Sequence, residues 1–427
     1  MQIGSADAKT ATRAEPVLLR FMLVATVALV GANLRPFITS IGPLAVSVQN
    51  DTGLSLQGLS LLTLVPMLLM GVMAFIAPTL QRAIGTRRLV VAALLVIAGG
   101  CALRMATASG WGMIMTAALI GLGVAIVQAI FPGIIKREFP RHVGPMMGLY
   151  SAMLMIGGAL GALVSPIVSA LTGSWAIGLA CFALPAMVAV ALAFVFLPAD
   201  IHGGQHVQPT TRAFLARPRT WLLMLCFGLV NGGYSSIVAW FAPAYQEYGW
   251  NAAASGGLLA VLAVSQAVSA LTLPVLARKG LDRRPWIWLT LAMQGAGFAG
   301  LAFAPGLAPL SWAVALGAGL GGCFALVMIV VLEHLPDPTQ AGTLSALMQG
   351  GGFLIASVPA WLVAALHDFT GSYRAGWIWH LVSVAIVAGL TSRLAPAGYE
   401  RAMQLRTRAG GLIGIKSAPA CPATSAR

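Results

Sequence analysis

One arginine stands inside an otherwise apolar stretch near the start of the chain. Arg35 lies in the segment GANLRPF (31–37), within a run from Leu18 to about Val48 that holds no acidic side chain. A guanidinium stays charged and presents a planar fork of donors, and at the centre of a bilayer it costs roughly 2.5–3.5 kcal/mol on insertion scales. We therefore expect Arg35 to face a hydrated cavity or a ligand, and its positive charge indicates an anion.

The composition is that of a membrane protein. Hydrophobic residues make up 59% of the 427 positions and charged residues only 8%, which exceeds what soluble globular chains carry. The formal charge of +14 would suggest nucleic acid in a soluble chain, but the basic residues fall in short gaps between apolar runs. We therefore expect a lipid bilayer and no nucleic acid as partner. The five cysteines show no paired spacing, so neither a disulfide framework nor a metal or other cofactor is expected.

Apolar windows of about 20 residues predict an all-α polytopic protein with twelve membrane-spanning helices. The predicted helices begin near Leu18, Leu54, Leu89, Gly112, Gly144, Trp175, Trp221, Ala252, Trp286, Leu310, Thr343 and Arg374. The first run is too long for a signal peptide and contains Arg35, so it is interpreted as the first helix.

The basic residues also predict the orientation. Of 25 Lys and Arg residues, all but Arg35, Arg104 and Arg374 lie at the termini or in alternate connections, hence on one side of the membrane. Because Lys and Arg favour the cytoplasmic side, both termini are expected in the cytoplasm of a bacterial inner membrane.

The two halves of the chain repeat one another. GLYSAMLMIGG (148–158) matches GTLSALMQGGG (342–352), and PTLQR (78–82) recurs as PVLAR (274–278). A duplicated unit of six helices gives two parallel repeats, with a substrate site near the midplane where they meet. The expected divisions are an N-terminus (1–17), a first bundle (18–198), a linker (199–218), a second bundle (219–395) and a basic tail (396–427).

The linker holds His202 and His206, which are four residues apart. On a helix this spacing could present two metal ligands, but Gly203 and Gly204 lie between them and no further ligand is near. We therefore interpret the segment as a polar connection and not as a metal site.

Several segments carry a family resemblance. They are NLRP (33–36) followed by GP (42–43), GLGVAIVQAIFPGIIKREFP (121–140), GLYSAM (148–153), WFAPAYQEYG (240–249) and LSALMQGGGFLIA (344–356). Through them the chain resembles the cyanate permease and 2-nitroimidazole porter branch of the major facilitator superfamily. The resemblance implies two six-helix bundles that act as a monomer.

The resembled fold also implies which side chains line the central cavity. Its first, fourth, seventh and tenth helices face the centre, and its fifth and eleventh close the sides. The side chains so nominated are Asn33, Arg35, Gln128, Asn231, Tyr234 and Trp240, together with Tyr150 and Gln349. Arg35 would hold the anion, the amides would add neutral donors and the aromatic rings would shape the pocket. Core packing for the rings, and hydrogen bonding between helices for the amides, are the alternatives.

Two further polar residues lie inside predicted helices. Arg104 lies about 15 residues beyond Leu89, roughly 22 Å across the membrane at about 1.5 Å per residue. We interpret it as reaching the outer headgroups, although a second arm of an anion clamp is the alternative. His380 is in the last helix, which is peripheral in the resembled fold, and is expected to be hydrogen-bonded or interfacial.

All eleven acidic residues fall in termini, loops or helix ends. Cation exporters rely on carboxylates within the membrane, so cation efflux is not expected. We expect a transporter of a small anion, cyanate-like or a small carboxylate, driven by protons, by a counter-anion or by diffusion alone. The alternative is an exporter of neutral or weakly acidic aromatic compounds. A membrane enzyme or sensor is not expected, because no nucleophile with a base and no metal cluster is present.

Overall fold

The computed structural model describes residues 17–107, 109–139, 141–198, 211–277, 280, 282–335 and 338–403, and the described chain is helical with no strand. Twelve helices are long and apolar enough to cross a membrane, which confirms the predicted number. The predictions made for residues 1–16, for His202 and His206, and for residues 404–427 lie outside the described part.

The first half supplies six spans. They are α1 (Val17–Ala32) with α2 (Pro36–Thr39) and α3 (Ile41–Thr52), then α4 (Leu56–Ile84), α5 (Thr86–Leu103) with the 3-10 turn η1 (Arg104–Ala106), α6 (Gly110–Glu138), α7 (Val143–Thr172), and α8 (Trp175–Ala180) with α9 (Ala183–Phe196). Ser55, Ser109 and Ser174 begin α4, α6 and α8, and each side-chain oxygen accepts a hydrogen bond from a backbone N–H in the first turn. These caps satisfy donors that have no partner inside a helix.

The second half supplies the other six. They are α11 (Pro218–Glu247), α12 (Ala252–Leu276), α13 (Arg284–Phe303), α14 (Pro309–Glu333), α15 (Pro338–Thr370) and α16 (Arg374–Thr391). The short α10 (Thr211–Leu215) lies in the predicted linker, and the 3-10 turn η3 (Pro396–Gly398) and α17 (Tyr399–Met403) lie in the predicted tail.

The first span is not the single helix that its hydropathy predicts. It is divided at residues 33–35 and again at Ser40. Pro36 has no backbone N–H to continue the hydrogen bonds of α1. Arg35 becomes the residue that precedes α2, with φ −117° and ψ −25°.

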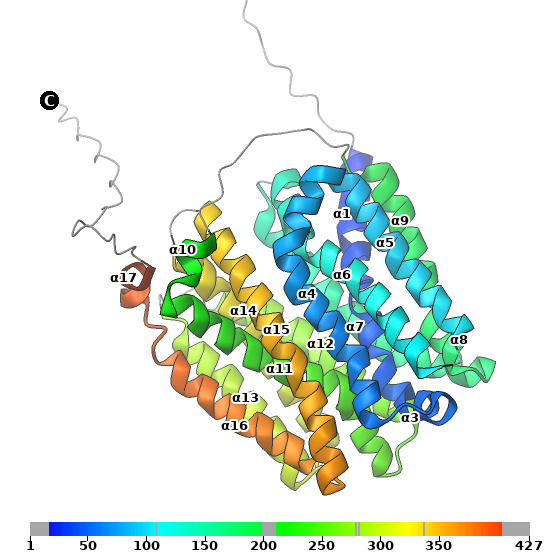
Figure 1. The fold of residues 1–427 in the computed structure, drawn as a ribbon. Coiled ribbons are helices and arrows are strands. Elements are labelled where there is room, and N and C mark those ends of the chain that lie inside the picture. Colours follow the sequence, from blue (N-terminus) through cyan, green and yellow to red (C-terminus); the bar gives the residue numbers. More distant parts are fainter. Residues whose placement is uncertain are drawn as a thin grey trace, which may run out of the picture.

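The halves lie side by side (Figure 1), with α4 against α15 and α7 against α12 across the boundary. Glycine permits the closest approaches: a Cβ on Gly42 would lie 2.8 Å from the Val238 carbonyl oxygen, and one on Gly256 would collide with the Ala162 carbonyl. Among the described residues, hydrogen bonds also join the halves, from Gln246 Nε2 to the Pro43 carbonyl oxygen (2.8 Å) and from Gln57 Nε2 to Asp368 Oδ2 (3.2 Å).

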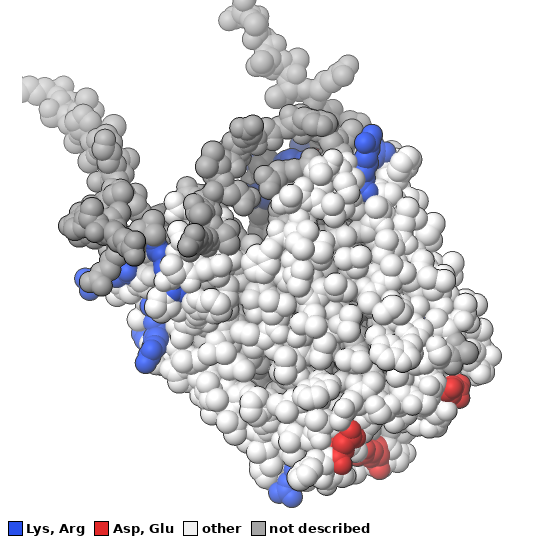
Figure 2. Space-filling model, viewed as in Figure 1, with Lys and Arg blue, Asp and Glu red and all other residues white. Residues whose placement is uncertain are grey.

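Basic side chains gather at one end of the molecule. Figure 2 shows most of the basic side chains near the end where α9 stops and α11 begins, and acidic side chains at the opposite end. Asp51, Glu247 and Asp368 lie in the last turns of α3, α11 and α15, at that opposite end. The wide surface between the two ends carries large exposed apolar side chains, which face lipid in a protein that spans a membrane.

Candidate functional site

Arg35 is held by its backbone while its side chain points into the protein. Its carbonyl oxygen accepts from the backbone N–H groups of Ile38 (3.2 Å) and Thr39 (3.3 Å), and from Thr39 Oγ1 (3.2 Å). Only 6% of the residue is exposed, and Nε has no hydrogen-bond partner among the described residues. The division of the first span therefore fixes the position of a buried charge and leaves part of its donor fork unused.

Arg35 lines a cavity between the halves. The cavity is small, with a volume of about 10 Å³, which is room for about one water molecule. Its lining comes from the first half through Arg35 and Met155, and from the second half through Val230, Asn231, Tyr234, Gln266, Leu320 and Phe324. The structure thus brings Arg35, Asn231 and Tyr234 into one lining, and their roles as ligands stay predictions.

The second half offers Arg35 an aromatic face. The guanidinium carbon of Arg35 lies 4.3 Å from the centroid of the Tyr234 ring, a cation–π contact across the boundary between the halves. Asn231, one helical turn before Tyr234, donates from Nδ2 to the Phe227 carbonyl oxygen (2.9 Å). One amide N–H of Asn231 remains for a ligand, so α11 presents a ring and a neutral donor to the cavity.

Gln266 on α12 is a lining residue that sequence reasoning missed. It is buried at 3% exposure, and its amide offers two donors and an acceptor from the half opposite to Arg35. The eighth span was not among those expected to face the centre. A glutamine in the middle of an apolar helix was the signal that could have identified it.

Asn33 does not line this cavity. Its Nδ2 donates to the carbonyl oxygens of Leu29 (2.8 Å) and Pro185 (3.3 Å), which ties the end of α1 to α9. Glycines of α7 pack on the other side of the break: a Cβ on Gly157 would collide with the Ala32 carbonyl oxygen, and one on Gly161 would lie 2.7 Å from Pro36 Cα. Asn33 therefore supports the segment that carries Arg35.

Arg104 does not reach the outer headgroups, contrary to the expectation from the sequence. The residue is fully buried, Nη1 donates to the Phe37 carbonyl oxygen of α2 (3.2 Å), and Nε and Nη2 have no partner among the described residues. The chain leaves α5 in the turn η1, which carries the side chain inward under α2. The position of Arg104 along a straight helix predicts its depth in the membrane, but not the direction in which its side chain points.

Trp240 lies outside the cavity lining. Its Nε1 donates to the Ala360 carbonyl oxygen (2.7 Å), and its ring packs 5.7 Å from that of Tyr373. The ring is 1% exposed and joins α11 to α15, which is the packing alternative for the aromatic residues.

Three other nominated residues lie outside the lining of the Arg35 cavity. Tyr150 stacks on Phe131 at 5.4 Å, and its hydroxyl is buried without a partner among the described residues. Gln128 Oε1 is likewise buried and unpartnered, and Gln349 Nε2 contacts Ser345 Oγ at 3.4 Å. Their roles as ligands stay predictions.

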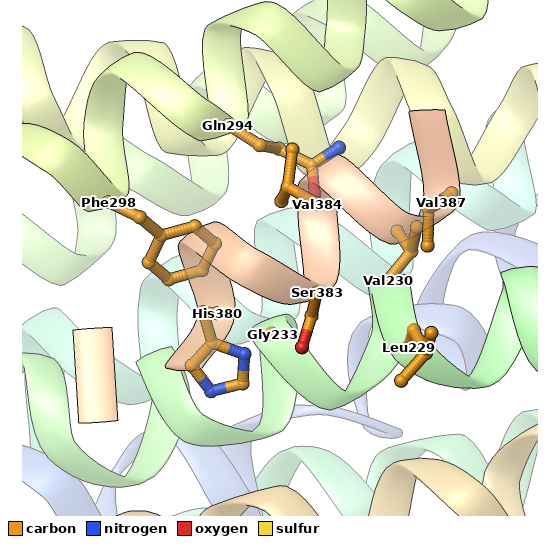
Figure 3. A pocket seen from close by; sticks show the side chains of 9 residues that line it. All are labelled: Leu229, Val230, Gly233, Gln294, Phe298, His380, Ser383, Val384 and Val387. Atoms are coloured by element: carbon orange, nitrogen blue, oxygen red, sulfur yellow. The ribbon is translucent and has the colours of Figure 1, made fainter. Parts of the chain in front are cut away.

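His380 differs from its expected state. It is buried at 1% exposure and stacks on Phe298 at 5.0 Å, and its Nε2 has no partner among the described residues. The imidazole lines a second small cavity, of about 10 Å³, between α11, α13 and α16 (Figure 3). The histidine is therefore neither interfacial nor fully hydrogen-bonded.

Solved transporters share this fold. A bacterial homolog of the human lysosomal transporter Spinster, inward-facing and occupied, superposes with a TM-score of 0.75 over 92% of this chain and all of its own, at 16% identity. A D-xylose–proton symporter gives 0.74 over 88% of this chain and 98% of its own, at 14% identity.

Sequence relatives are closer. The cyanate transport protein CynX of Escherichia coli (strain K12) is 38% identical over 371 residues, 87% of this chain and 96% of that protein. The 2-nitroimidazole transporter of the same organism is 30% identical over 380 residues, 86% of this chain and 93% of that protein. These two relatives confirm the branch that the sequence motifs indicated. The family model of the Major Facilitator Superfamily matches residues 21–360, and the chain is a member of that superfamily of membrane transporters.

Proposed function

We propose that this transporter moves a small anion, of the cyanate or small-carboxylate class, by secondary active transport with alternating access. One observation carries the proposal: Arg35 is buried in a cavity between the halves, with an unpartnered Nε and no described carboxylate beside it. A buried guanidinium without a counter-charge is costly, so a bound anion would offset a cost that the empty protein bears. The likeness to a cyanate transport protein supports this substrate class.

The size and lining of the cavity favour a small ligand. Its volume of about 10 Å³ lies far below the roughly 300–1,000 Å³ of pockets that hold drug-sized molecules. Arg35 would supply charge-assisted donors from the first half, and Asn231 and Gln266 would add neutral donors from the second. An anion held in this way contacts both halves, which is what a substrate must do to influence their relative movement.

The distribution of basic side chains supports an orientation in the membrane, and the hydrogen bonds between the halves support a conformational state. Most basic side chains gather at the end where α9 stops and α11 begins (Figure 2), which favours that end as cytoplasmic. The bonds Gln246–Pro43 and Gln57–Asp368 lie at the other end. The proposed state is therefore closed toward the outside of an inner membrane, with both termini inside. Because one chain supplies both walls of the cavity, the proposed unit is a monomer.

Replacing Arg35 tests the proposal. In proteoliposomes that take up labelled cyanate, Arg35→Ala should lower uptake at least a hundredfold, because truncating one partner of a buried charged pair costs about 3–5 kcal/mol. Arg35→Lys should take up cyanate little faster than Arg35→Ala does, since a lysine lacks the planar fork of donors. Arg374→Ala is the matched control: this exposed arginine also faces an aromatic ring, Phe303 at 5.2 Å, but lies at the start of α16. Uptake by Arg35→Ala at the wild-type rate would refute the role of Arg35.

A second candidate is export of neutral or weakly acidic aromatic compounds. The relative named as a 2-nitroimidazole transporter and the rings of Tyr234 and Phe324 in the lining favour it. Deletion and overexpression should then change the susceptibility of cells to a panel of nitroaromatic compounds. Unchanged susceptibility together with cyanate uptake would reject export.

A further inference from the structure

The cavity around His380 lies on the far side of α11 from Arg35. Val230 lines both cavities, so a single helix separates them. Along α11, Asn231 and Tyr234 face the Arg35 cavity, while Leu229 and Gly233 face the His380 cavity. Two cavities, each lined only in part by polar side chains, thus share one wall, and that wall belongs to a helix that contacts the proposed substrate.

The walls around His380 are mostly apolar, with two polar side chains, Gln294 and Ser383, and no charge. Figure 3 shows Gln294, Phe298 and Ser383 around the imidazole. Gln294 Nε2 donates to the Gly319 carbonyl oxygen (3.1 Å), and Ser383 Oγ donates to the Trp379 carbonyl oxygen (2.9 Å). The side chains of Gln294 and Ser383 therefore hydrogen-bond to backbone. Nε2 of His380 has no hydrogen-bond partner among the described residues and borders the cavity.

No fixed charge faces the imidazole from the helices packed against α16, which are α11, α13 and α15. Their charged or titratable side chains lie at helix ends, apart from Tyr234 and Cys226 on α11, and α16 itself carries only Arg374 at its first residue. The end residues are Arg219, Tyr245 and Glu247 on α11, Arg284 on α13, and His367 and Asp368 on α15. Across α11 lies the Arg35 cavity, whose net charge changes when an anion binds.

We propose that His380 binds a proton that travels with the anion, so that the protein is a proton–anion symporter with its two ligand sites on opposite faces of α11. This inference rests on the proposed function. Nε2 would take the proton from water on the uptake side and return it to water on the other side. The anion itself is carried unchanged.

Electrostatics couples the two sites. With the anion cavity empty, a proton on His380 would place a second positive charge near Arg35 in an apolar interior, which is unfavourable. A bound anion neutralises Arg35 and removes that repulsion, so each ligand favours binding of the other. The empty protein and the doubly loaded protein then carry the same interior charge. Unit charges about 10 Å apart, the width of a helix, at an effective dielectric constant of about 20 change one another's affinity on the order of tenfold.

Calorimetry of cyanate binding tests the inference on the purified, full-length protein. Titrations from pH 7 down to about 5, in two buffers of different ionisation enthalpy at each pH, report the protons taken up with each anion. The wild type should take up protons, and its affinity for cyanate should fall as pH rises. His380→Gln should bind cyanate without proton uptake, and its affinity should not vary with pH.

His334→Gln is the matched control. His334 is also buried at 1% exposure with an unpartnered Nε2, but it follows α14 and lines neither cavity. Its replacement should leave proton uptake at the wild-type value. Cyanate binding without proton uptake by the wild type, or proton uptake that persists in His380→Gln, would overturn the role of His380 and leave the proposed function standing. No binding of cyanate by the wild type would reject the proposed function itself.

Transport supplies a second measurement in case His380→Gln binds poorly in detergent. In proteoliposomes the variant should exchange labelled for unlabelled cyanate as fast as the wild type, because exchange needs no net proton movement. Accumulation driven by an imposed pH gradient should fall at least tenfold. Equal losses in exchange and in accumulation would show that the histidine is needed for the fold or for the reorientation of the halves, and would overturn the inference.

Discussion

The first span of each half faces the same cavity, but the two are built differently. In the first half it is divided into α1, α2 and α3, and the division places Arg35 in the cavity. In the second half α11 runs for 30 residues without a break and presents Asn231 and Tyr234 from one face. A duplicated unit has thus become one half that carries the charge and one that supplies neutral contacts.

The glycines beside these spans show how firmly each is held. Gly157 and Gly351 correspond in the repeat of 148–158 and 342–352. A Cβ on Gly157 would collide with the backbone of Ala32, just before the break, whereas one on Gly351 would lie 2.6 Å from the sulfur of Met224. A methionine side chain can change its conformation more easily than a helix backbone can shift. The packing around Gly157, next to the segment that carries Arg35, is therefore more rigid than the packing around Gly351.

The largest effect is expected from exchanging these glycines for alanine. Gly157→Ala should prevent folding or destabilise the protein beyond the roughly 1–3 kcal/mol of ordinary overpacking, because backbone must shift. Gly351→Ala should cost less than that, since Met224 can change rotamer. Thermal unfolding in detergent measures both, with Gly99→Ala, where the added Cβ meets open space, as the control. Equal losses for the two variants would contradict the difference in rigidity.

The next effect concerns the ends of α6 and α14. Both helices end on a glutamate, and the residue that follows is Phe139 in the first half and His334 in the second. Burial lowers the pKa of His334 from 6.5 to about 4. The unfolded chain therefore binds a proton at a higher pH than the folded protein, and stability should be lost as pH falls from about 6.5 toward 4, by roughly 3 kcal/mol at most.

His334→Phe places at the end of α14 the residue type that follows α6, and it should remove this loss of stability at low pH. Unfolding temperatures measured across that pH range test it. His142→Phe, an exposed histidine at the start of α7, is the control and should leave the pH dependence as it is. A pH dependence that survives in His334→Phe would place its origin elsewhere.

The smallest effect is expected where the two spans meet. Tyr234→Leu removes the aromatic face under Arg35 and should weaken anion binding about 2- to 30-fold, in line with about 0.5–2 kcal/mol for a cation–π contact. Tyr234→Phe keeps the face and should bind within about twofold of the wild type. Binding of cyanate measured by calorimetry distinguishes the two variants. A loss in Tyr234→Phe equal to that in Tyr234→Leu would assign the effect to the hydroxyl.

Some residues that the sequence nominated line the Arg35 cavity and others do not, and the difference has a physical reason. Arg35 and Asn231 were predictable because polar groups in an apolar run must find a polar environment. Trp240 and Asn33 satisfied the same criterion but found theirs in backbone carbonyls of Ala360 and Pro185, more than a hundred residues away in the chain. The sequence cannot distinguish a hydrogen bond to a neighbouring helix from a contact with substrate.

Hydropathy, basic connections and the internal repeat by themselves determined twelve spans and two similar halves, because a bilayer requires apolar helices of a set length. The tertiary structure decided what each half contributes. It divided the first span at Pro36, turned Arg104 inward to Phe37, and brought Gln266 into the cavity. These features depend on how helices distant in sequence pack, and packing in three dimensions is not encoded in the polarity of one helix alone.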